Sequence, residues 1–133
     1  MRTDEQRRIL ISKLPNFTPE FERIFDSRDL SIQDMFLDIV EKLLESPFKQ
    51  YTTHKPDYSM SKNTVFCCIF LQVKCLMVHV KVNNHRVTSN LIQLLEYKDA
   101  SKAKVPYIKF KVMSNNQIDE AFRLINTAYE YDT

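Results

Sequence analysis

The chain has 133 residues, which is enough for one domain with its own hydrophobic core. Apolar residues make up 44% and charged residues 27%, a composition that fits a folded protein and excludes an intrinsically disordered one. Glycine is absent, which excludes the glycine-rich phosphate loops of nucleotide-binding enzymes.

Positive charge is concentrated in the middle of the chain, although the net charge is only +2. Residues 51–112 carry 10 Lys and Arg against 3 Asp and Glu, a net charge of +7. Residues 1–50 carry 8 against 10, and residues 113–133 carry 1 against 4. This asymmetry suggests an anionic partner for the middle segment.

The cysteines and the apolar runs indicate the cellular compartment in which we expect the protein to work. The first eight residues are mostly charged or polar, and the longest apolar run, Val65 to Leu71, has only the length of a strand. Cys67, Cys68 and Cys75 are odd in number and lie in strand-like sequence. We therefore expect a reduced, cytoplasmic protein that makes no contact with a membrane.

A short helix is predicted at the start of the chain. Thr3 is a good cap, acidic residues follow it, and Pro15 ends the helix. Because this helix is short and terminal, we expect residues 1–16 to dock loosely or to serve as a homodimer contact.

Two more helices are predicted before residue 47. Thr18 and Pro19 form a typical helix start. From Ile32 to Leu44, apolar residues recur at steps of three and four, which predicts an amphipathic helix with Ser31 as its cap.

The middle of the chain changes to an alternating pattern. Both faces of Val65–Leu71 are apolar, which predicts a central strand, whereas Leu76–Val82 and Tyr107–Val112 alternate like half-buried strands. Residues 51–54 and 57–60 could supply an earlier strand, with Pro56 between them favouring an edge or a bend.

Two further helices are predicted in the second half. Ser89 and Asn90 suggest a short helix from Leu91 to Tyr97, and Ser114 with Gln117 forms a capping-box pattern before a final helix. The order of elements predicts a single α+β domain over residues 1–133. We expect a mostly antiparallel sheet of three to four strands, flanked by N-terminal helices and a C-terminal helix.

The chain from about Phe36 onward resembles a bacterial domain-of-unknown-function family, number 5655, whose members are described as predicted transport proteins. The matching segments are the amphipathic helix, the strands that follow it and the final strand–helix pair. They are Ile32–Leu44, Tyr58–Ile69, Leu76–Val82, Tyr107–Ser114, Ile118–Ile125 and Ala128–Glu130.

The resemblance implies a small α+β module that occurs alone or at the end of longer proteins, including defence nucleases. It supplies no catalytic residues to carry over. The family has a loop with Gly, His and Trp before its last strand, whereas residues 101–106 here contain none of them. The function of that loop is therefore not carried over to this chain.

Catalytic chemistry has weak support in the sequence. A Cys–His pair could be a nucleophile with its base or two metal ligands, and Cys75 with His79 is such a pair, with His85 as a further candidate. No second motif completes either site, and free cysteines are usually small core residues. We predict no catalytic residue, no metal ligand and no cofactor.

The basic residues of the middle segment form the candidate binding site. Lys109, Lys111 and Tyr107 share one strand face by parity, and lysines beside tyrosine can hold phosphates while the ring stacks on bases. An ordinary solvated sheet face is the competing interpretation. The candidate contact residues are Lys81, His85, Arg86, Lys102, Lys104, Tyr107, Lys109 and Lys111.

Three functions follow from these patterns. The first is a non-enzymatic binding module that contacts nucleic acid or a protein partner through the basic sheet face. The second is a small Cys/His-dependent enzyme, and the third is an oligomerisation domain that uses the terminal helices.

Overall fold

The computed structural model describes residues 2–15, 17–45, 50–54, 57–62, 64–82, 87–91, 96–99 and 106–132. The helices are α1 (Asp4–Ser12), α2 (Pro19–Asp26), α3 (Leu30–Leu44) and α4 (Ile118–Tyr131), and a 3₁₀ turn, η2 (Asn115–Gln117), precedes α4. The strands are β1 (Gln50–His54), β2 (Asp57–Ser61), β3 (Val65–Leu71), β4 (Leu76–Lys81), β5 (Glu96–Asp99) and β6 (Pro106–Val112).

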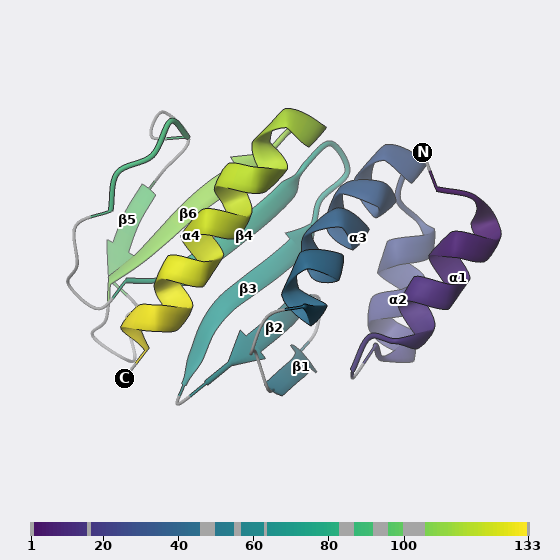
Figure 1. Ribbon diagram of the computed structural model, residues 1–133, viewed down its shortest axis with the longest axis horizontal. Helices are drawn as coiled ribbons and strands as arrows, with labels where there is room; N and C mark the ends of the chain where they lie inside the picture. Colours follow the sequence, from purple (N-terminus) through teal and green to yellow (C-terminus); the bar gives the residue numbers. More distant parts are fainter. Residues whose placement is uncertain are drawn as a thin grey trace.

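The strands form one antiparallel sheet in the order β1-β2-β3-β4-β6-β5 (Figure 1). The α+β class, the antiparallel sheet and the flanking helices at both ends of the chain are confirmed. Within the described residues the sheet has six strands rather than three or four, because short edge strands are added on both sides.

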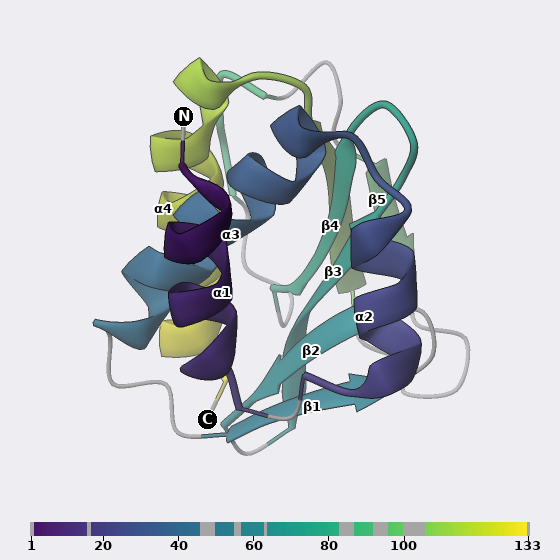
Figure 2. The same cartoon turned by 90° about the vertical axis from the view of Figure 1, so that its right-hand side faces the viewer.

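Two helices cover one face of the sheet. The helices α3 and α4 lie side by side across it in Figure 1, and both stand on the same side of the strands in Figure 2. The alternating residues of the central strands point into this layer, so that Ile69, Val78 and Phe110 are fully buried. The core therefore lies between this face and the two helices.

The helix α1 is fixed to α3 by a buried ion pair. Arg7 Nε donates to Asp34 Oδ1 at 3.0 Å, and Nη2 donates to Oδ2 at 3.2 Å. Leu10 and Leu14 join the core, whereas Ile9 stays half exposed. We expected residues 1–16 to dock loosely or to serve as a homodimer contact; the Arg7–Asp34 pair and the two leucines give α1 a defined contact with α3, and the homodimer contact stays a prediction.

Three local predictions are wrong. The Ser114–Gln117 capping box is not formed, because a 3₁₀ turn follows Ser114 and α4 begins only at Ile118 without a side-chain cap. The helix α3 begins at Leu30 after Asp29, so Ser31 lies inside it and is not its cap. Glu96 and Tyr97 belong to β5, where a helix was predicted over 91–97. Pairing with β6 overrides the local helix signal there, because the register of a sheet is set by contacts far apart in sequence.

Candidate functional site

The candidate site is the second face of the sheet, which points away from α3 and α4. Successive side chains of a strand alternate between faces, so the residues between the buried ones form this surface. We call it the outer face, and its side chains on β3, β4 and β6 are Cys68, Phe70, Met77, His79, Tyr107, Lys109 and Lys111. Lys111 is exposed and the other six are half buried.

The strand register brings lysines and rings together on the outer face. Lys109 lies opposite His79, and Lys111 lies opposite Met77. Across the next strand pair, Met77 lies opposite Phe70. Because neighbouring strands are about 4.8 Å apart, the row from Phe70 to Lys111 spans roughly 10 Å. Cations and aromatic rings therefore lie within reach of one ligand.

The rings of the outer face make an apolar surface beside these cations. The centroid of the His79 ring lies 4.8 Å from that of Phe70, with the planes tilted by 45°. Tyr107 is half buried beside this surface, and burial raises the pKa of its hydroxyl. The tyrosine is therefore neutral near pH 7 and adds no negative charge to the face.

Lys81 does not contribute to the exposed charge. Its side chain is buried, with 6% of the residue exposed, and its Nζ lies 2.9 Å from Asp132 Oδ1. Thr64 completes this cluster, because its Oγ1 donates to the same carboxylate at 2.7 Å. We predicted Lys81 as a contact residue, but the structure places it in an internal ion pair.

The remaining predicted contacts fall into two groups. Tyr107, Lys109 and Lys111 share the outer face, as parity predicted. His85, Arg86, Lys102 and Lys104 lie outside the described residues.

Sequence reasoning missed Phe70 as a part of this surface. Both faces of β3 are apolar, so we expected it to be covered on both sides. The alternating pattern of β4 was the available signal, because pairing β3 with β4 across the tight turn at Gln72–Cys75 places Phe70 opposite Met77.

A chain of polar groups links β2 to Cys68 on the outer face. The Ser59 hydroxyl donates to Asp57 Oδ2 at 2.6 Å and lies 3.5 Å from Cys68 Sγ. Burial raises the pKa of the Cys68 thiol to about 11, and the nearby Asp57 carboxylate acts in the same direction. The thiol is therefore protonated near pH 7, whereas a nucleophilic cysteine needs a lowered pKa.

The structure also gives no support for the predicted Cys75–His79 pair as a nucleophile with its base. The Cys75 thiol donates to Gln72 Oε1 at 3.2 Å, and burial raises its pKa as well. His79 lies opposite Cys68 in the register, and its ring packs on Phe70. These features disfavour the Cys/His enzyme.

A wide cleft of about 770 Å³ lies on the helical side, between α1, α3 and the turn before α4. The charged residues of its lining are Arg2 and three acids, Asp34, Asp38 and Glu41. Arg2 is paired with Asp38 and Glu41, and Arg7 binds Asp34. The charges of this cleft therefore serve internal contacts between α1 and α3.

Within the described residues, no group of three His, Cys, Asp or Glu side chains is placed to hold a metal ion. The helices of that same part of the chain are too short or too polar to cross a membrane. No family model matches the chain, and the searches of curated proteins and of solved structures returned no match. The resemblance to family 5655 stays a prediction.

Proposed function

We propose that this protein is a non-enzymatic module that binds single-stranded nucleic acid across the outer face of its sheet. One observation carries the proposal: the β4–β6 register sets Lys109 and Lys111 beside the rings of His79 and Phe70. Lysines neutralise phosphates, and exposed rings stack on bases without regard to sequence.

The charge of the outer face agrees with an anionic ligand. Asp57, the nearest acid on β2, is buried and accepts a hydrogen bond from Ser59. On the other side, the register sets Glu96 of β5 opposite Lys109 and Lys98 opposite Tyr107. On β3, β4 and β6, the outer face carries Lys109 and Lys111 and no carboxylate side chain.

A single strand fits this surface better than a duplex. The bases of a duplex are already stacked on one another, whereas those of a single strand are free to stack on protein rings. The rings and lysines lie on adjacent strands of one face rather than along a helix that could enter a groove.

Binding can be measured by fluorescence anisotropy with labelled single-stranded DNA, single-stranded RNA and a DNA hairpin duplex. Two phosphate contacts predict a slope of about −1.4 in log affinity against log salt, or roughly a sevenfold loss between 50 and 200 mM. Both single strands should bind more tightly than the duplex. If none of the three ligands binds in a salt-dependent way, the proposal fails.

The matched control removes the same charge elsewhere. Arg8 and Lys13 are exposed residues at α1, on the helical side of the molecule. The variant Arg8→Gln/Lys13→Gln should bind like the wild type, whereas Lys109→Gln/Lys111→Gln should lose most of the affinity. Equal losses in both variants would show that only the overall charge matters.

A further inference from the structure

A pocket opens at the end of the outer face where β3 turns into β4. It has a volume of about 360 Å³, near the lower end of the range for small-molecule sites. Its lining residues come from the end of α2 and from the β3–β4 turn, and they are Ile24, Arg28, Phe70, Leu71, Gln72 and Val73. Phe70 belongs to both the pocket and the outer face, so the two are continuous.

We propose that this pocket takes one unstacked base of the single strand whose phosphates lie on Lys109 and Lys111. The inference rests on the proposed function and names a specificity subsite within it. The pocket combines a ring, an apolar wall and a guanidinium, which are the groups that hold a splayed base in single-strand recognition.

Arg28 is held in place and still has donors for a ligand. Its Nε donates to the carbonyl of Leu71 at 2.8 Å, and its Nη1 donates to Ser27 Oγ at 3.0 Å. A guanidinium has more N–H donors than these two bonds use. The bond to Leu71 ties Arg28 to the end of β3, so the remaining donors are presented at a defined position beside Phe70.

The spacing suits a nucleotide. Phe70 lies two strands away from Lys111 along one row of the sheet, which corresponds to roughly 10 Å. That is the scale of the reach from a backbone phosphate to the far edge of its base. A base in the pocket and a phosphate on Lys111 can therefore belong to the same or neighbouring nucleotides.

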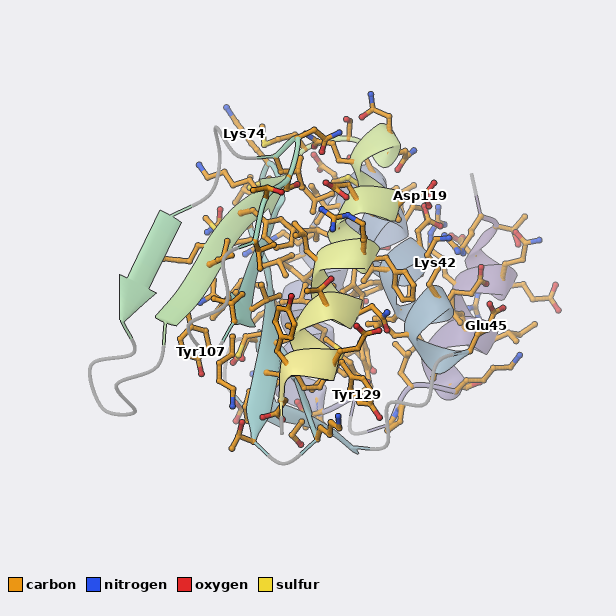
Figure 3. The ribbon with its side chains drawn as sticks, turned by 60° about the vertical axis from the view of Figure 1, so that its left-hand side comes forward. Lys42, Glu45, Lys74, Tyr107, Asp119 and Tyr129 are labelled. Carbon is orange, nitrogen blue, oxygen red and sulfur yellow. The ribbon has the colours of Figure 1, made fainter. Side chains whose placement is uncertain are left out.

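The charge around the pocket also favours a nucleic acid over an uncharged aromatic ligand. Lys74 is exposed in the β3–β4 turn, and Figure 3 shows it at one end of the sheet, with Tyr107 near the other end. Arg28 and Lys111 are the other cations near this end of the outer face. Val73, which is 65% exposed, gives the rim an apolar contact for a base.

The test compares an oligothymidine of about 12 nucleotides with an abasic chain of the same length. Phe70→Leu keeps an apolar side chain but removes the ring, so it should weaken binding of the oligothymidine by at least about fivefold. Its affinity for the abasic chain should not change. Val73→Asn at the rim removes an apolar base contact without adding charge and should have the same selective effect, while Ile9→Asn on α1 should have no effect on either ligand.

The outcomes separate this inference from the proposed function. If Lys109→Gln/Lys111→Gln abolishes binding while Phe70→Leu and Val73→Asn bind both ligands like the wild type, the pocket takes no base and only this inference is overturned. If the wild type binds neither ligand, the proposed function falls as well. An equal loss for both ligands in Phe70→Leu would also overturn the subsite, because a base contact cannot act on an abasic chain.

Discussion

The buried cluster around Asp132 predicts a large loss of stability when its charge is removed. Asp132 is 1% exposed, and its carboxylate accepts from Lys81 Nζ, from Thr64 Oγ1 and from the Thr64 backbone N–H at 2.7–3.0 Å. Asp132→Asn keeps the shape but leaves the Lys81 ammonium buried without its counter-charge. Removing one partner of a buried pair typically costs about 3–5 kcal/mol, a large share of the total for a domain of this size.

Urea denaturation of Asp132→Asn measures this loss directly, with the free energy of unfolding as the readout. Asp119→Asn is the control, because Asp119 is 90% exposed and lies 3.3 Å from the partly exposed Lys42, so its loss should cost less than about 1 kcal/mol. Adding Lys81→Met to Asp132→Asn should restore part of the stability, since it removes the unpaired cation. A loss within about 1 kcal/mol for Asp132→Asn would refute the internal pairing of Lys81.

Three further predictions concern the helices and a thiol. Thr3→Ala removes the capping box in which Thr3 Oγ1 accepts from the Gln6 N–H, and should lower the free energy of unfolding by about 1 kcal/mol. Alkylation of Cys68, measured by peptide mass spectrometry, should be roughly a hundredfold slower at pH 7 than alkylation of a free cysteine. The rate should increase as the pH rises toward about 11. A fast reaction at pH 7 would revive the enzyme hypothesis. Arg123 lowers the pKa of Glu120 to about 2, so the free energy of unfolding of Glu120→Gln should be below that of the wild type above about pH 5. This difference should shrink as the pH falls toward 2. A constant difference across this range would contradict the ion pair.

The elements that sequence predicted well are those with strong local signals. The spacing of apolar residues in Ile32–Leu44 is complete within one segment, and this segment forms the helix α3. The alternation of Leu76–Val82 is also complete within one segment, which forms the strand β4. The alternation of side chains along a strand was enough to predict that Lys109 and Lys111 lie on the same face. Such features need no knowledge of distant neighbours.

The features that were missed depend on contacts between distant segments. Asp34 lies inside the predicted helix Ile32–Leu44 with no local sign of a partner, but Arg7 binds it from α1. Lys81 looked like a surface lysine on a half-polar strand, but Asp132 buries it from the end of α4. The ion partner of a charged side chain is set by tertiary packing, which a single sequence does not encode locally.

The central claim is that Lys109 and Lys111 hold the phosphates of a single strand. The direct measurement is the salt dependence of oligonucleotide binding for the wild type and for Lys109→Gln/Lys111→Gln. The slope of log affinity against log salt should become less steep by about 1.4 in the variant, because each lysine accounts for one phosphate contact. An unchanged slope in a variant that folds like the wild type would contradict it.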